Sequence, residues 1–243
     1  TLEYPRILSA LADHCHFNPA RERALELQPS SDLEEVRGLQ NETADAVGLL
    51  TLHPGTTIGG ARDLRPIVDD ALRGIILEPT RLLQVKDSLV AARTLKRLFI
   101  KDQGEFPALE ILSAQLPESL GLVSLITRVI SEKNEVLDSA SEKLGQIRKD
   151  LRTQHTRLKN RMNQMLKKLE VAKYLQESII TQRTGRYVLP LKAEARSSVP
   201  GLVHDQSTSG ATIYVEPQAM VEANNKFRNL ELDERDEVQR ILA

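Results

Sequence analysis

Aromatic residues make up only 3% of the 243-residue chain, and tryptophan is absent. Proteins that bind unpaired bases usually stack them on aromatic side chains, so this composition argues against that kind of recognition. The single cysteine, Cys15, excludes internal disulfides and zinc sites built from several cysteines, and it fits a reducing cytosol. The sequence also lacks a signal peptide and an apolar run of about 18 residues, so we expect a cytoplasmic protein without membrane contact.

The formal net charge of −1 hides a strong segregation of charge along the chain. Residues 143–173 contain ten lysines or arginines and two acidic residues, a local net charge of +8 that leaves −9 for the remainder. A cationic segment in a chain that is otherwise acidic predicts a surface for a polyanion on one structural element.

The sequence predicts a mainly α fold with four regions. Residues 1–138 are expected to form a helical core, in which Asn18 precedes Pro19 as a helix start and Ser31 opens a capping box. A long basic helix follows over 139–177, a β-rich insert over 178–217, and the start of a returning helix over 218–243. Since the chain lacks an initial Met and a helix stop signal at its end, we expect it to be part of a longer protein.

The long helix carries a narrow apolar stripe. Leu144, Leu151, Leu158 and Met165 recur every seven residues, which is typical of a coiled-coil seam. A capping box at Ser139 would open the helix, which would be roughly 54 Å long if it were helical from Ser141 to about residue 176. The acidic residues of 218–243 suggest that this segment returns antiparallel along it, forming a coiled-coil lever.

The insert shows two hairpin patterns. Strands around Ile179–Ile180 and Tyr187–Leu189 flank the turn dipeptide Thr184–Gly185. Strands at Leu202–Val203 and 213–215 flank the turn at 207–210, and Pro200–Gly201 separates the two hairpins. These strands predict a small antiparallel structure at the tip of the lever, either as one sheet or as two separate hairpins.

The basic residues of the helix and insert are the candidate site. They could contact nucleic-acid phosphates, or they could form a solvated face that pairs with the acidic returning helix, and the pattern leaves both open. The candidate nucleic-acid-binding residues are Arg148, Lys149, Arg152, Arg157, Lys159, Arg161, Lys167, Lys168, Lys173, Arg183, Arg186, Lys192 and Arg196.

No catalytic or metal site is predicted. His204 and Asp205 lie near Ser207 and Ser209, but adjacent strand residues point to opposite faces and cannot easily share a proton. Asp205 is expected to hydrogen-bond the following turn instead. The sequence also lacks a GxxxxGK[ST] phosphate loop, and His14 and His16 beside Cys15 would point in different directions on a helix.

Three segments resemble one known family. GRYVLPLKAE (185–194), VPGLVHDQSTSGATIYVEP (199–217) and EVLDSASEKLGQIRKDL (135–151) are similar to the second bacterial MutS subfamily, MutS-two. The opening LEYPRILSALADHC and the stretch GGARDLRPIVDDALRG are similar to its first region. The motif positions expected to have structural roles are Gly185, Tyr187, Pro190, Pro200, Gly201, His204, Asp205, Ser209, Gly210, Glu216 and Pro217.

The resemblance implies the amino-terminal core, lever and clamp-like region of a MutS-type protein. Family members continue into a dimerising ATPase that uses ATP and Mg²⁺, and into an Smr nuclease, neither of which lies in these residues. We therefore expect no enzyme activity and no cofactor in this chain. The family is associated with branched DNA and suppression of homologous recombination, or in some members with rescue of collided ribosomes.

Overall fold

The computed structural model describes residues 3–243, except for the side chains of Leu169 and Glu170. Contacts divide the chain into two compact units. Unit 1 comprises residues 1–137 with 242–243, and unit 2 comprises residues 138–241.

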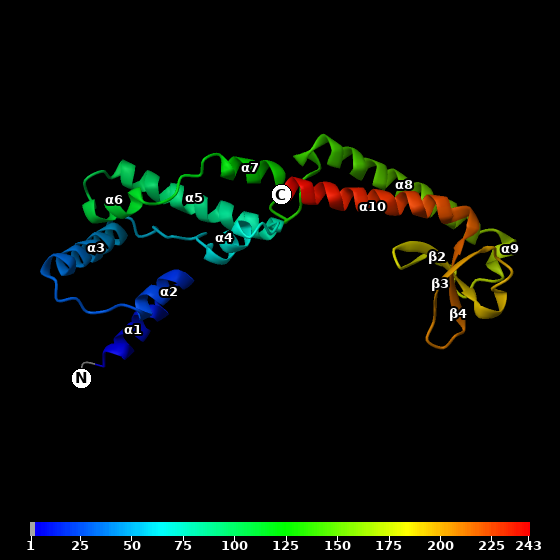
Figure 1. Cartoon of the computed structure of the whole chain (residues 1–243), viewed down its shortest axis with the longest axis horizontal. Coiled ribbons are helices and arrows are strands. Elements are labelled where there is room, and N and C mark those ends of the chain that lie inside the picture. The colour runs from blue at the N-terminus through cyan, green and yellow to red at the C-terminus, as the bar shows by residue number, and fades with distance from the viewer. Residues whose placement is uncertain (1–2) are drawn as a thin grey trace. The chain divides into compact units, whose positions relative to one another are not determined.

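Unit 1 is helical throughout its described regular elements. One packed cluster joins Leu49, Phe99 and Phe106, and a second contains Leu83 and Ile126. Its helices are α1 (Tyr4–Asp13), α2 (Asn18–Leu25), α3 (Leu33–Leu52), α4 (Arg65–Leu72), α5 (Pro79–Lys101), α6 (Pro107–Ala114) and α7 (Leu122–Val129), as Figure 1 shows.

Two predicted helix starts in unit 1 were wrong by one residue. The N-cap of α3 is Asp32, whose carboxylate accepts hydrogen bonds from the backbone N–H groups of Glu34 and Glu35 at 2.8 and 3.2 Å. The N-cap of α2 is Phe17, so Asn18 is already helical. Ser31 and Asp32 can each serve as a cap and α3 uses Asp32, whereas the Phe17 side chain makes no capping hydrogen bond to α2.

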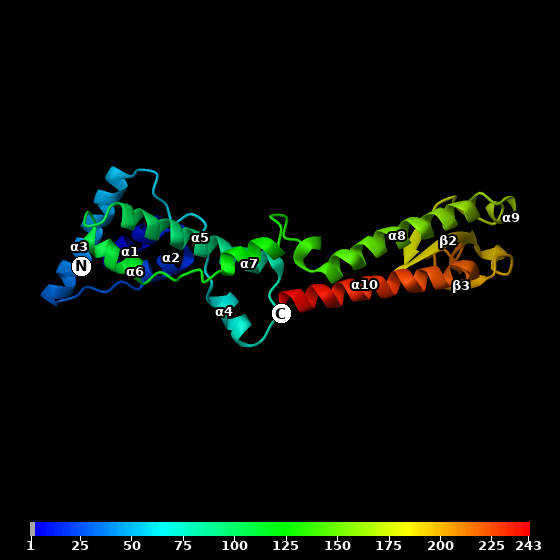
Figure 2. The same cartoon turned by 90° about the horizontal axis from the view of Figure 1, so that it is seen from above.

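Unit 2 contains two long helices and a small sheet. Its helical elements are η1 (Asp138–Ala140), α8 (Glu142–Leu166), α9 (Leu169–Ala172), η2 (Ala193–Ala195), η3 (Gln218–Met220) and α10 (Val221–Leu242, the last residue of which is grouped with unit 1). Figures 1 and 2 both show α8 and α10 side by side. They are antiparallel, because Ser141 at the start of α8 bonds Glu237, whereas Gln154 further along bonds the carbonyl of Ala223.

The predicted apolar stripe of α8 is buried. Leu144, Leu158 and Met162 are completely inaccessible to solvent, and Leu151 and Met165 are half-buried. Helix burial of this kind along one face, rather than local propensity, supplies most of the stability of a long helix.

The predicted capping box at Ser139 and the predicted end of this helix were wrong. Ser141, not Ser139, is the N-cap of α8, and its hydroxyl accepts the Leu144 N–H at 3.0 Å. The helix ends at Leu166 rather than near residue 176, because the following backbone pairs with the sheet. The N–H of Gln176 donates to the Pro190 carbonyl, and that of Lys192 donates to the Tyr174 carbonyl, both at 2.9 Å.

The insert forms one four-stranded antiparallel sheet. Its strands are β1 (Thr181–Arg183), β2 (Arg186–Lys192), β3 (Gly201–Gln206) and β4 (Thr212–Pro217), in the order β1-β2-β4-β3. Thr184 and Gly185 both have positive φ, 49° and 77°, as a type I′ hairpin turn requires. The predicted strand at Ile179–Ile180 begins two residues later, at Thr181.

The sheet packs against the two helices through one apolar core. Leu189 and Leu191 on β2 and Val215 on β4 join Leu158 of α8 and Phe227 of α10 in a single cluster. The insert is therefore an integral part of unit 2 and lies against its helix pair.

Candidate nucleic-acid interface

The cations at the start of α8 are held by carboxylates of unit 2. Arg148 Nε lies 2.6 Å from Glu234 Oε1, and its Nη1 lies 2.7 Å from Asp138 Oδ1. Arg152 reaches the same Asp138 at 3.2 Å, and Lys143 reaches Glu237 at 3.2 Å. The hydrogen bond from Arg148 lowers the pKa of Asp138 below its ordinary value. These cations therefore join the start of α8 to η1 and α10.

Six other predicted cations, four on α8 and two directly after it, are exposed, and none forms an ion pair with a carboxylate among the described side chains. Five of them lie after Arg152, where the ion pairs of this helix end. We call these six residues the unpaired row. They are Lys149, Arg157, Lys159, Arg161, Lys167 and Lys168.

The returning helix neutralises little of this charge. Residues 221–242 contain six acidic and four basic residues, and among the side chains that the structure describes only Glu234 and Glu237 of this helix form ion pairs with α8. Across unit 2, eighteen lysines or arginines stand against fourteen acidic residues, whereas the remaining residues of the chain have fifteen against twenty. The charge segregation seen in the sequence therefore follows the division into units.

Two cations of the insert region lie over aromatic rings. The Lys173 ammonium is 4.8 Å from the centre of the Tyr174 ring, and its hydrogen bond lowers the pKa of the Tyr174 hydroxyl. The Arg183 guanidinium lies 4.1 Å from the centre of the Tyr214 ring, and its Nε is 3.2 Å from Asp205 Oδ2. Both side chains therefore have partners already.

The remaining predicted cations of the insert differ in exposure. Arg196 is exposed and Lys192 is half-buried, and neither forms an ion pair with another described side chain. These two can extend the positive surface of the unpaired row toward the sheet.

Arg186 has a structural position that the sequence did not indicate. Its Nη1 donates to Glu216 Oε1 at 2.8 Å, and its Nη2 donates to Asn225 Oδ1 at 2.7 Å. The Glu216 side chain is fully buried, and its Oε2 lies 2.5 Å from His204 Nε2. Arg186 thus joins β2 to β4 and α10, and it is not part of the exposed cationic surface.

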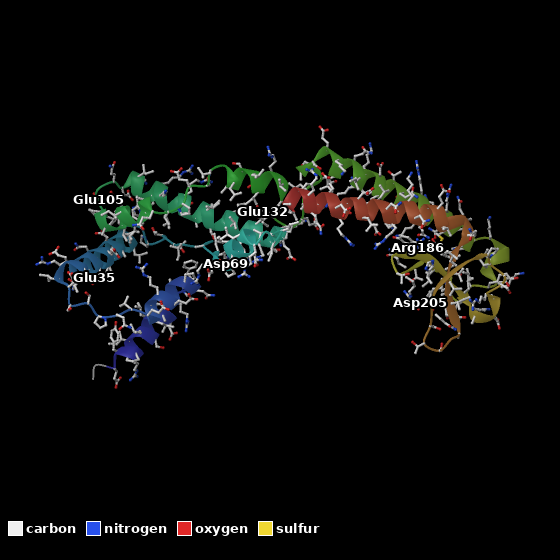
Figure 3. All side chains as sticks on the ribbon, viewed as in Figure 1. Glu35, Asp69, Glu105, Glu132, Arg186 and Asp205 are labelled. Atoms are coloured by element: carbon white, nitrogen blue, oxygen red, sulfur yellow. The ribbon has the colours of Figure 1, made fainter. Side chains whose placement is uncertain are left out.

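His204 and Asp205 have different partners, so they do not form a triad with the serines. A β-bulge at this point leaves His204 unpaired in the register, between the pairs Val203–Val215 and Asp205–Tyr214. Asp205 Oδ1 accepts the Gln206 N–H at 2.8 Å, and Figure 3 labels Asp205 and Arg186 in the region of the sheet.

Several motif residues have clear backbone roles. Gly185 and Gly210 have φ values of 77° and 74°, in the left-handed region that favours glycine. Gly201 is required by a close approach, since a Cβ there would lie 2.2 Å from the Glu216 carbonyl oxygen. The turn after β3 is held by Ser207 Oγ, which accepts the Thr212 N–H at 3.0 Å.

Sequence reasoning missed the residues that fix the sheet to the helices. The Asn224 side chain on α10 accepts the Tyr187 N–H at 3.0 Å and donates to the Tyr187 carbonyl at 3.1 Å. His155 and Phe227 pack their rings within 5.7 Å of Tyr187. The sequence does hint at Asn224, because it is a polar residue at a position where the apolar face of α10 would otherwise continue.

Comparison with known proteins finds similar proteins from one family. The chain is 41% identical over 242 residues to the Endonuclease MutS2 of Pelotomaculum thermopropionicum, covering 100% of the chain and 31% of that protein. It is 42% identical over 243 residues to the Endonuclease MutS2 of Symbiobacterium thermophilum, covering 100% and 30%. Over its whole length the chain is similar to part of Endonuclease MutS2. The resemblance drawn from the sequence motifs is thereby confirmed.

The whole chain matches only a part of each MutS2 protein. The chain spans about 31% of the length of the MutS2 relatives, including that of Thermomicrobium roseum, to which it is 40% identical. No protein-family model matches the chain. The described residues contain no group of three or more potential metal ligands, and none of their helices is apolar and long enough to cross a bilayer.

Proposed function

We propose that unit 2 is a nucleic-acid-binding arm of a MutS-type ATPase, in which α8 and α10 form a coiled-coil lever and the sheet forms a clamp-like tip. The observation that carries the proposal is the unpaired row, six exposed cations on α8 and directly after it without an acidic partner among the described side chains. Phosphate oxygens are the ligands that such a row fits best.

Contacts of this kind position a protein on a nucleic acid without reading its sequence. That suits the recognition of branched DNA and recombination intermediates, and in the full protein two such arms of a cytoplasmic homodimer would enclose the DNA and suppress homologous recombination. ATP and Mg²⁺ would act in an ATPase domain outside this chain, and we assign no catalytic residue to the 243 residues.

Binding should depend steeply on salt. Each phosphate neutralised contributes about −0.9 to the slope of log affinity against log salt concentration for duplex DNA. If all six cations of the unpaired row reach phosphates, the slope is about −5.

The test is charge reversal in the 243-residue chain. Lys159→Glu combined with Arg161→Glu should weaken binding to a fluorescent four-way DNA junction and reduce the magnitude of the salt slope by about two. The matched control, Lys101→Glu with Lys133→Glu, reverses two exposed lysines of unit 1 and should change neither. Equal losses in both variants, or unchanged binding by the first, would contradict the proposal.

Ribosomal RNA is the alternative polyanion, since the same cations would contact its phosphates. Co-sedimentation of a full-length MutS2 protein with ribosomes, set against its retention of branched DNA, separates the two targets. A third alternative is a purely structural lever that couples the ATPase to the clamp. In that case the double charge reversal leaves both kinds of binding unchanged.

A further inference from the structure

The side of α8 opposite its buried stripe carries neutral polar residues along its middle. At about 100° per residue, Thr153, Thr156, Asn160 and Asn163 fall close to one line on this side. All four are exposed. The threonine hydroxyls donate to carbonyls of their own helix, but neither asparagine side chain bonds another described residue. The two amides are therefore available to a ligand.

Cations border this neutral line on both sides and at both ends. Arg157 and Arg161 lie on one side of it and Lys159 on the other, while Lys149 and Lys167 continue the line at its two ends. No acidic residue lies between Asp150 and Leu166. The exposed side of α8 thus has a polar uncharged centre within a positively charged border.

This arrangement matches the dimensions of a DNA groove. An α-helix with its side chains is about 10–12 Å across, and the B-DNA major groove is about 12 Å wide with phosphates along both walls. Cations on the two sides of the helix would face opposite walls, and the asparagine amides would face the base edges. An asparagine amide can make two hydrogen bonds to the N6 and N7 atoms of adenine.

Unpaired strands fit this surface less well. Tyr187 and Phe227 pack against His155, the Tyr214 ring lies against Arg183, and Tyr174 against Lys173. Each tyrosine and phenylalanine ring of unit 2 therefore already has a neighbour, which leaves little room for base stacking. The major groove of A-form RNA is too deep and narrow to admit a helix.

We propose that α8 lies in the major groove of duplex DNA, with Asn160 and Asn163 against the base edges and the flanking cations on the two backbones. The inference rests on the proposed function of unit 2, and it specifies duplex DNA and one groove as the target.

The experiment measures groove contact separately from backbone affinity. The 243-residue chain is titrated with a 16-base-pair DNA duplex, with each of its single strands, and with the matching RNA duplex. Dimethyl sulfate then probes guanine N7, an atom exposed in the major groove. The variant Asn160→Ala with Asn163→Ala should remain folded, because alanine is favourable at exposed helix positions.

We expect the wild-type chain to prefer duplex DNA and to protect guanine N7. The double variant should lose that protection and at least about fivefold in affinity, while its salt slope stays unchanged. Salt-dependent binding without N7 protection, or equal affinity for single strands or duplex RNA, would overturn the groove inference. Neither result would contradict the proposal that unit 2 binds nucleic acid. Absence of salt-dependent binding to any of these probes would overturn both.

Discussion

Removal of the Glu216 carboxylate should destabilise unit 2 strongly. The side chain is fully buried on β4 and accepts from Arg186 Nη1 at 2.8 Å, with His204 Nε2 at 2.5 Å. In Glu216→Ala both partners remain in place, with only 26% and 19% of their side chains exposed, and lose their anion. Breaking a buried pair by removing one partner costs about 3–5 kcal/mol.

A second carboxylate of the same sheet provides the matched control. Asp205 pairs with Arg183 at 3.2 Å, but the two side chains are 48% and 36% exposed. Solvent-exposed pairs contribute about 0–1 kcal/mol, and Arg183 would retain its contact with the Tyr214 ring. Asp205→Ala should therefore cost at most about 1 kcal/mol. Burial, rather than the presence of an Arg–carboxylate pair, accounts for the difference.

The assay must report on unit 2 alone, because a chain of two units need not unfold in one transition. Hydrogen exchange of the β2 and β4 amides gives the free energy of opening for the sheet itself. A loss of 3 kcal/mol raises the opening constant by more than about a hundredfold. If Glu216→Ala opens the sheet no more readily than Asp205→Ala, the buried carboxylate does not hold these strands together.

Two further predictions concern other parts of the molecule. The hydrogen bond from Arg240 is the main reason that the pKa of Glu237 is held at about 2. The ionised Glu237 therefore stabilises the fold above its ordinary pKa of 4.5, and this stability is lost as the pH falls from 4.5 toward 2. Glu237→Gln should remove that part of the acid transition in a pH series of thermal melts, and an unchanged transition would refute the assignment. Gly201→Ala places a Cβ 2.2 Å from the Glu216 carbonyl oxygen and should destabilise the sheet by about 1–3 kcal/mol. Gly38→Ala in α3, where a Cβ has no neighbour within 4 Å, should instead stabilise unit 1 by about 0.5–1 kcal/mol. Thermal melts of the two variants check both predictions, and equal effects of the two substitutions would contradict them.

Local sequence signals predicted the elements of unit 2 but not where they end. The Thr184–Gly185 turn and the turn at 207–210 defined both hairpins, because positive φ is a local requirement. The end of α8 at Leu166 was not predictable in this way, since no proline or glycine marks it. The backbone of residues 174–176 pairs with β2, and a contact between distant segments overrides helix propensity.

The same distinction applies to the candidate interface. Composition located the cationic helix, but neighbours such as Arg148 and Lys149 differ only in the direction in which they point. Arg148 reaches Asp138 and Glu234, whereas Lys149 is exposed and pairs with no described carboxylate. Which cations serve structure and which remain exposed depends on tertiary neighbours, and a single sequence does not contain that information.

The distribution of ion pairs along α8 itself supports a ligand for its later turns. Up to Arg152 the helix is joined to η1 and α10 through charges, and beyond it through apolar contacts and the Gln154 hydrogen bond to Ala223. Arg157 and Arg161 are one turn apart, a spacing at which like charges destabilise a helix by about 0.2–0.5 kcal/mol. The free arm bears that repulsion, and a bound polyanion would relieve it. Thermal stability of the wild-type chain should therefore rise with added duplex DNA more than that of the Lys159→Glu, Arg161→Glu variant.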